Sequence, residues 1–273
     1  MNEGTIVTGD ACQIAYRLDG PEHAPILLLS NSLGTTLQMW DPQMEAFTRN
    51  YRVLRYDSRG HGKSDAPAGS YSLDRLGRDV IELIDALGFG LVDFCGLSLG
   101  GMTGQWLGVH APQRIGRLVL ANTSAYMGPP AGWDARIDLV REKGMAPLAD
   151  ASVARWFTDD FAASGAAASV VAMLMETNPT GYIGCCAAIR DMDMRRTSTL
   201  IGLPTLVIGG SLDPSTPLSH SEDLVRAIAD SKLGVLAAAH LSSFELPQAF
   251  NAMVLGFLHE HFEERNPLHA ITS

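Results

Sequence analysis

The order of apolar and polar positions along the chain predicts strands that alternate with helices. Residues 5–18 form two short alternating runs around Gly9-Asp10, which is typical of a hairpin. Further strands are predicted at residues 26–29, 51–56, 92–95, 117–121, 204–210 and 232–236. Helices are predicted at residues 40–50, 73–87, 102–110 and 246–262. Such alternation predicts an α/β fold with a mostly parallel central sheet flanked by helices.

The strand rhythm disappears between residues 124 and 200. This segment contains six of the eleven methionines and three short helical patterns, one of which carries Trp133 on its apolar face. Methionine-rich helices inserted between strands are typical of an adaptable cap over a pocket. The alternative for any single methionine is an ordinary core position. We therefore predict an α/β core, 1–123 and 201–273, with a helical cap insertion, 124–200.

A possible nucleophile lies between a predicted strand and a predicted helix, in Gly96-Leu97-Ser98-Leu99-Gly100. This is a G-x-S-x-G elbow in the strand-turn-helix context that the motif requires. Glycines beside a serine in a strained turn let the strand and the helix approach closely. The amino end of the helix favours negative charge on a substrate oxygen. Ser98 is therefore the candidate nucleophile.

A base and its orienting acid follow in the expected places. Asp213 comes just after the strand at 204–210, and His240 just after the last strand. A serine hydroxyl needs a base, and the base needs a third group that fixes its tautomer. Each residue alone has a simpler explanation: chance, a turn or the surface. Together, in the order Ser, Asp, His of the α/β-hydrolases, they predict a catalytic triad.

The oxyanion hole is predicted from two backbone N–H groups. One belongs to Leu99, after the nucleophile. The other belongs to Leu33, in the loop Asn31-Ser32-Leu33-Gly34 after the first buried strand. Ser32 brings a hydroxyl where a glycine often stands, and it either contacts substrate or stabilises the turn.

The segment Asp57–Ser64 mimics the end of a phosphate-binding loop through Gly62-Lys63-Ser64. A true phosphate loop would have glycine at position 57, where this chain has aspartate. The segment is therefore predicted to be a structural turn with Asp57 and Arg59 in hydrogen bonds. The second hypothesis for Asp57 is an alternative triad acid.

The charge balance narrows the class of partner. A formal net charge of −10 and a pI of about 5.2 argue against nucleic acid or an anionic membrane surface, since both need a basic face. No secretory signal or membrane span is recognised in the sequence. Four cysteines, without framework spacing, indicate reduced thiols and a cytoplasmic location. The oligomeric state is left open.

The motifs above resemble the α/β-hydrolase superfamily over about Ile26 to Phe262, and within it the 3-oxoadipate enol-lactonases. The elbow specifies only the superfamily, and the other segments are more specific. They are Ser30-Asn31-Ser32-Leu33-Gly34-Thr35, Arg55-Tyr56-Asp57-Ser58-Arg59-Gly60-His61-Gly62, Phe94-Cys95-Gly96-Leu97-Ser98-Leu99-Gly100-Gly101, Gly132-Trp133-Asp134-Ala135-Arg136-Ile137 and Ala238-Ala239-His240-Leu241-Ser242.

The resemblance implies hydrolysis of 3-oxoadipate enol-lactone, in the β-ketoadipate route of aromatic catabolism, through an acyl-enzyme on Ser98. It implies no metal and no organic cofactor. The substrate is a small anionic lactone, and its carboxylate calls for a cation under the cap. Trp133 is the candidate pocket wall. The candidate cations are Arg136, Arg190, Arg195 and Arg196.

Two other classes of function remain open from the sequence. One is a general carboxylesterase, or a hydrolase of another small lactone or carbon–carbon bond, with the same triad. The other is a ligand receptor on a hydrolase scaffold that turns its ligand over very slowly. A panel of substrates separates the first from an enol-lactonase, and ligand binding without turnover would indicate the second.

Overall fold

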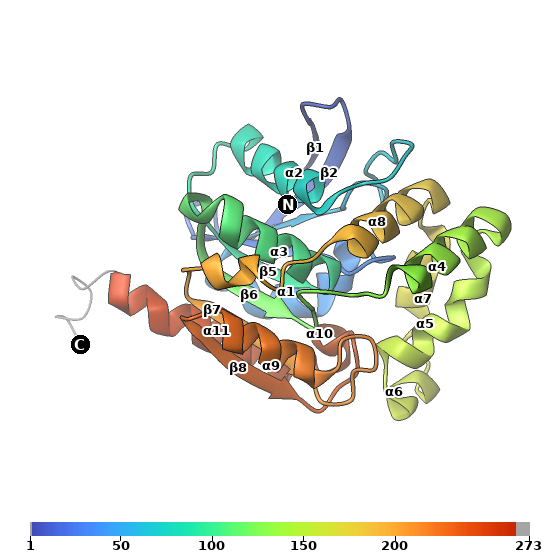
Figure 1. Cartoon of the computed structure of the whole chain (residues 1–273). Helices are drawn as coiled ribbons and strands as arrows, with labels where there is room; N and C mark the ends of the chain where they lie inside the picture. Colours follow the sequence, from blue (N-terminus) through green and yellow to red (C-terminus); the bar gives the residue numbers. More distant parts are fainter. Residues whose placement is uncertain (1, 266–273) are drawn as a thin grey trace.

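The computed structural model describes residues 2–265, and the side chains of residues 2–260. Its centre is an eight-stranded sheet in the order β1-β2-β4-β3-β5-β6-β7-β8 (Figure 1). The first two strands run antiparallel to their neighbours, and β3 to β8 are all parallel. The strands are β1 (Asn2–Val7), β2 (Gln13–Asp19), β3 (Ile26–Ser30), β4 (Arg52–Tyr56), β5 (Val92–Leu97), β6 (Ile115–Ala121), β7 (Thr205–Gly210) and β8 (Ser231–Leu236).

Helices outside the 124–200 segment flank this sheet. Helix α2 packs against α3, and α1 packs against α11. Strands β3, β5 and β6 are almost wholly buried, although β5 carries Asp93 and β6 carries Arg117. The continuous apolar run at residues 26–29 predicted this burial for β3. The helices are α1 (Asp41–Phe47), α2 (Leu73–Ala86), α3 (Leu99–His110), α9 (Leu218–Ala227), α10 (Ser242–Glu245) and α11 (Pro247–Arg265).

Two predicted helices differ from the observed ones because proline fixes where a helix begins. The helix predicted at 40–50 is a 3₁₀ turn, Leu37–Trp40, followed by α1, with Pro42 in its first turn. The helix predicted at 246–262 is α11, which starts at Pro247 after the separate short α10. Proline lacks the backbone N–H that a helix interior needs, so it fits only the first turn.

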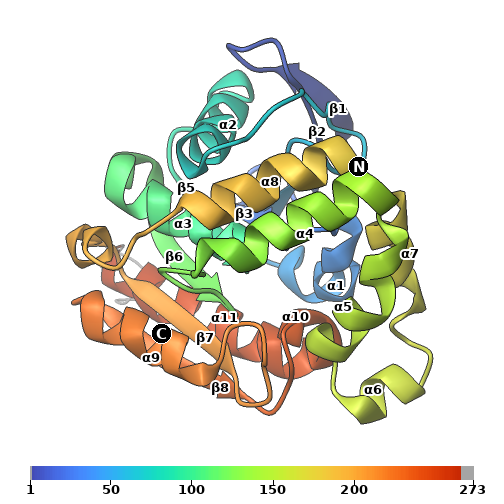
Figure 2. The same cartoon turned by 45° about the vertical axis from the view of Figure 1, so that its right-hand side comes forward.

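Residues 124–200, all of which the structure describes, contain helices and no strand. The prediction of three helical patterns here was too low. Helices α4 and α8 lie side by side over the sheet, as Figure 2 shows. The five α-helices are α4 (Pro130–Lys143), α5 (Ala149–Trp156), α6 (Asp159–Ala163), α7 (Ala168–Glu176) and α8 (Pro179–Asp191). Two 3₁₀ turns, Ala146–Leu148 and Thr197–Leu200, complete the segment.

Across the described residues, no helix combines the length and the apolar character needed to cross a bilayer. The sheet topology determines which loops can bring their functional side chains together. Because β3, β5, β6, β7 and β8 run parallel, the loops that follow them lie at one edge of the sheet. The loops that carry Ser32, Ser98, Asp213 and His240 all follow these strands.

Candidate active site

Ser98 stands in a strained turn between β5 and α3. Its backbone has φ 57° and ψ −112°, a conformation that non-glycine residues rarely adopt. A Cβ atom on Gly96 would lie 2.2 Å from the carbonyl oxygen of Gly100, and one on Gly100 would lie 2.1 Å from that of Ser30. Only glycine fits at either position, as the sequence predicted, and the serine side chain is left facing the cavity.

Asp213 and His240 meet as predicted. Nδ1 of His240 donates a hydrogen bond to Oδ2 of Asp213 over 2.8 Å. The same carboxylate also accepts hydrogen bonds from Asn122 Nδ2, the Thr216 hydroxyl, and the backbone N–H groups of Ser215 and Thr216. Burial alone would raise the pKa of Asp213, but the charge of His240 and the bonds from His240 and Thr216 outweigh it and lower this pKa. The carboxylate therefore stays ionised beside the imidazole.

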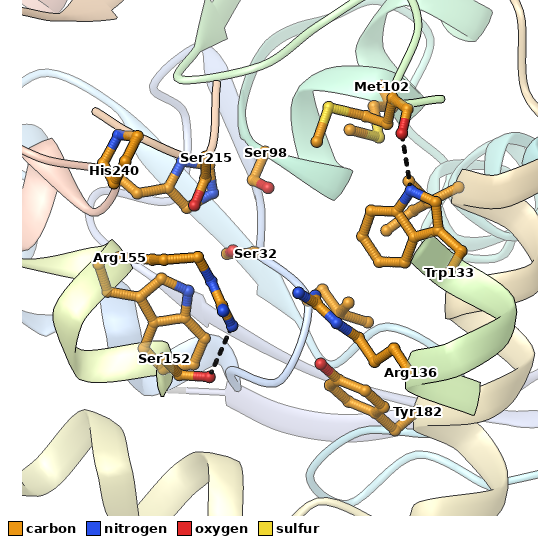
Figure 3. A pocket seen from close by; sticks show the side chains of 15 residues that line it. Ser32, Ser98, Met102, Trp133, Arg136, Ser152, Arg155, Tyr182, Ser215 and His240 are labelled. Carbon is orange, nitrogen blue, oxygen red and sulfur yellow. Dashed lines mark hydrogen bonds between the residues drawn. The ribbon is translucent and has the colours of Figure 1, made fainter. Parts of the chain in front are cut away.

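The hydroxyl of Ser98 and the imidazole of His240 line the same cavity (Figure 3). Within the described residues, the Ser98 hydroxyl has no hydrogen-bond partner, His240 included. In unliganded sites the bond between nucleophile and base is often long and tightens only when substrate binds. The structure thus brings the three candidate residues to one place, with the Asp–His half already joined.

The two N–H groups predicted for the oxyanion hole are free to bind an anion. In the described part of the chain, the backbone N–H groups of Leu33 and Leu99 donate to no protein atom. Their neighbours are all engaged: the N–H groups of Ser98 and Gly100 donate to backbone carbonyls, and that of Gly34 to His61. Leu33 lines the cavity together with Ser98, and Leu99 directly follows Ser98 in the chain.

The cavity has a volume of about 230 Å³ and combines core and cap residues. Ser32 and Trp133, both predicted to line it, do so. The Trp133 indole N–H donates to the carbonyl of Met127 over 2.8 Å, which fixes the ring as a wall. Of the six cap methionines, Met127 lines the cavity, while Met145, Met192 and Met194 are buried core residues, as the alternative for single methionines allowed. The lining residues are Ser32, Leu33, Ser98, Met102, Met127, Trp133, Arg136, Ser152, Arg155, Trp156, Tyr182, Ile189, Pro214, Ser215 and His240.

Two guanidinium groups enter this cavity, and no carboxylate from the described residues lines it. Figure 3 shows Arg136 and Arg155 pointing toward one another from opposite walls. Burial, and then the nearby charge of Arg136, lower the pKa of Arg155. Among the described residues neither arginine has an acidic partner, although Arg155 donates to the Ser152 hydroxyl over 3.4 Å. Such a pair favours an anionic ligand.

Arg155 and Ser152 were not identified from the sequence, because α5 carries no motif that marks them. The other predicted cations lie elsewhere. Arg190 pairs with Asp134 and Asp191, and Arg195 pairs with Asp193. Neither they nor Arg196 line the cavity. The half-buried position of Arg155 beside the cavity is thus visible only once the cap helices are assembled.

Asp57 takes the structural role that the sequence favoured. Its carboxylate accepts hydrogen bonds from the backbone N–H groups of Leu37 and Lys63. The partner of His240 is Asp213, so the alternative of Asp57 as triad acid is wrong for this conformation. Among the described residues, no three His, Cys, Asp or Glu side chains are grouped in a way that could hold a metal ion.

The elbow, the Asp–His pair and the sheet topology together define the hydrolase class built on this α/β architecture. A family model described as the alpha/beta hydrolase fold matches residues 25–247, and the chain belongs to that family. The chain is 42% identical to 3-oxoadipate enol-lactonase 2 of Acinetobacter baylyi over 250 residues, which are 91% of this chain and 94% of that protein.

Two solved structures are similar over most of their length. A hydrolase from Pseudomonas aeruginosa has a TM-score of 0.92 and 51% identity, with 94% of this chain and 98% of that chain covered. The enol-lactonase from Burkholderia xenovorans has a TM-score of 0.91 and 40% identity, with 94% and 100% covered. The resemblance that the motifs indicated is therefore confirmed.

Proposed function

We propose that this protein is an enol-lactonase that opens 3-oxoadipate enol-lactone to 3-oxoadipate. The observation that carries the proposal is one cavity lined by Ser98, by His240, which is bonded to Asp213, and by two arginines that have no acidic partner among the described residues. The likeness to enol-lactonases over nearly the whole chain supports the same substrate. The chemistry needs a nucleophile, a base, an oxyanion hole and a cation, and each has a candidate here.

The proposed first step is acylation of Ser98. The serine oxygen attacks the lactone carbonyl carbon while Nε2 of His240 takes the serine proton. Negative charge then develops on the carbonyl oxygen, and the N–H groups of Leu33 and Leu99 stabilise it. Collapse of the tetrahedral intermediate breaks the ring C–O bond. The leaving group is an enolate, which is more stable than an alkoxide, and His240 returns the proton to it.

The second step releases the product. Water replaces the leaving group beside His240, gives a proton to Nε2 and attacks the acyl carbon. Asp213 keeps Nδ1 protonated and stabilises the imidazolium in both steps. The ester bond to Ser98 breaks as His240 passes the proton from water to the serine oxygen, and the enol relaxes to the ketone. These steps need only residues of this chain and water.

Substrate binding is assigned to the cap side of the cavity. The carboxylate of the lactone would lie between Arg136 and Arg155, where charge-assisted hydrogen bonds replace the missing acidic partner. Trp133 would pack against the ring, and Ser32 would contact it near the oxyanion hole. This arrangement selects a small anionic substrate in a chain that is itself acidic.

We further propose a cytoplasmic location. Its support is the four free cysteines, all buried. Burial raises the pKa of the Cys186 thiol to about 12, so that this group stays protonated. Thiols kept reduced and unpaired suit a reducing compartment.

Turnover by purified wild type and Ser98→Ala tests the function. We expect the wild type to open the enol-lactone with a higher kcat/KM than any simple aryl ester. Ser98→Ala should lose at least about 10⁴-fold in kcat while keeping its fold. Equal or better hydrolysis of aryl esters would indicate a general esterase. Tight lactone binding with negligible turnover by the wild type would indicate a receptor.

A further inference from the structure

The turn Asp57–Ser64 is the one sequence motif that the proposed reaction does not use. It is stiffened by its own hydrogen bonds, among them His61 N–H to the Ser58 carbonyl and the Ser64 hydroxyl to the Asp57 carbonyl. His61 lies inside it, with 1% of its surface exposed, and it does not line the active-site cavity. Its ring nevertheless contacts the loop that carries Leu33.

The contact is a hydrogen bond from the backbone N–H of Gly34 to Nε2 of His61, at 2.9 Å. Since Nε2 accepts, the ring proton lies on Nδ1, which faces the carbonyl oxygen of Arg59 at 3.3 Å. Two backbone groups thus fix the tautomer. Burial lowers the pKa of His61 to about 4, so the ring is neutral at neutral pH and can accept.

This hydrogen bond fixes the orientation of the peptide unit between Leu33 and Gly34, which could otherwise rotate. Ser32 to Thr35 form a β-turn closed by Thr35 N–H to the Ser32 carbonyl at 3.2 Å. Gly34, its third residue, has φ 76°, as a type II turn requires. Types I and II differ by rotation of the peptide between the second and third residues, here Leu33 and Gly34. An acceptor placed against the Gly34 N–H selects one rotation.

The residues on the other side of Leu33 are also fixed. The Ser32 N–H contacts the sulfur of Met39 at 3.3 Å, and the Asn31 side chain bonds to Trp40 and to the carbonyl of Tyr56. Leu33 therefore lies between two anchored neighbours, with its own N–H unengaged in the described structure. His61 supplies the anchor on the glycine side.

We propose that His61 is a positioning residue for the oxyanion hole: its neutral imidazole fixes the Leu33–Gly34 peptide and thereby aims the Leu33 N–H at the substrate oxygen. The proposal rests on the oxyanion hole assigned above. A donor misplaced by a fraction of an ångström stabilises the transition state less, while ground-state binding is nearly unchanged.

Two amide variants separate this role from simple packing. In His61→Gln the amide oxygen can take the place of Nε2 and accept from Gly34. In His61→Asn the shorter amide can still donate to the Arg59 carbonyl but cannot reach Gly34. We expect His61→Asn to lower kcat by about 10- to 100-fold with KM within about threefold of wild type. His61→Gln should stay within about fivefold of wild type in both.

A trifluoromethyl ketone bearing a terminal carboxylate gives a second readout that needs no turnover. Ser98 Oγ adds to its carbonyl carbon, the serine proton passes to His240, and the former carbonyl oxygen becomes an oxyanion in the hole. Its affinity should fall in His61→Asn in parallel with kcat/KM. Adipate, which forms no covalent bond, should bind both variants within about threefold of wild type.

Ser198→Ala is the matched control, because it removes a buried hydrogen bond, to Gln105, away from the cavity. It should leave kcat and ketone affinity unchanged. The proposal is overturned if His61→Asn keeps wild-type kcat and ketone affinity, or if His61→Asn and His61→Gln lose kcat equally. It is also overturned if KM and adipate affinity change instead of kcat. Failure of the proposed function is a different result: wild type that neither opens the lactone nor binds the ketone.

Discussion

Asp213 Oδ2 accepts a hydrogen bond from the Nδ1–H group of His240 at 2.8 Å, while its other oxygen, Oδ1, accepts from the backbone N–H groups of Ser215 and Thr216. The two backbone donors fix which oxygen faces which partner. An amide in place of this carboxylate would keep its oxygen against them and turn its NH₂ toward His240. The imidazole would then have to carry its proton on Nε2, the atom that must accept from Ser98.

Asp213→Asn should therefore lose activity through the wrong tautomer and not through unfolding. We expect kcat to fall by about 10³- to 10⁴-fold with adipate affinity within about threefold of wild type. Steady-state kinetics and calorimetric titration measure the two quantities. Asp223→Asn, at an exposed residue paired with Arg226, is the control. A loss smaller than tenfold in Asp213→Asn would contradict the assigned acid.

The arginine pair predicts where selectivity for anionic substrates resides. Replacing Arg155 with Met removes a guanidinium that no acid neutralises in the described structure and that lines the cavity. Hydrogen bonds to a charged group contribute about 1.5–3 kcal/mol, so KM for the enol-lactone should rise about 10- to 100-fold. Hydrolysis of an uncharged ester should change less than threefold.

Arg141→Met serves as the control for this change, because Arg141 is on α4 with Arg136 but pairs with Asp138 on the surface. It should leave both substrates unaffected. Arg136→Met should raise KM about as much as Arg155→Met. The double variant should lose less binding free energy than the sum of the two single losses, because both arginines hold the same carboxylate. An equal effect on charged and uncharged substrates would refute the carboxylate site.

The reactive residues could be predicted from the sequence because each one adjoins a recognisable strand. Ser98 follows β5, Asp213 follows β7 and His240 follows β8, and parallel strands bring such loops to one edge. Arg155 has no such neighbour. It lies near Arg136 only because the short cap helices pack together, and no local sequence pattern predicts that proximity. The bond from Gly34 to His61 joins residues 27 apart for the same reason.

The cap helices were undercounted because most of them lack a sequence signal for where they begin. Helices α4 to α7 have no side-chain hydrogen bond at the amino-terminal cap. Only α8 is capped in this way, by Asn178 accepting from the Thr180 N–H. Tertiary packing, and not capping, decides where the uncapped helices begin and end.

Two glycines, one in the elbow and one in α4, predict opposite effects of substitution by alanine on stability. In Gly100→Ala the new Cβ would lie 2.1 Å from a backbone oxygen of β3, which cannot move without displacing the sheet. We expect this variant to lose about 3 kcal/mol or more of unfolding free energy, together with activity. Gly132→Ala, in α4 with no atom within 4 Å of the new Cβ, should gain roughly 0.5–1 kcal/mol. Urea denaturation measures both.

His61 also predicts how stability changes in mild acid. Burial lowers the pKa of this histidine from 6.5 to about 4 in the folded protein. Between these two pH values the unfolded chain binds a proton at this site and the folded protein does not. The contribution of His61 to the unfolding free energy is therefore complete above pH 6.5 and is lost as the pH falls toward 4. The loss amounts to about 3 kcal/mol.

Comparison of wild type with His61→Gln isolates this contribution, because the other acid-sensitive groups are common to both proteins. The unfolding free energy of the wild type should fall by about 3 kcal/mol more than that of the variant between pH 7 and pH 4. His23→Gln, which removes an exposed imidazole, is the control for the loss of a histidine side chain. Parallel curves for wild type and His61→Gln would mean that the buried ring takes up its proton as readily as in the unfolded chain. Such a ring could not remain the acceptor that holds Gly34.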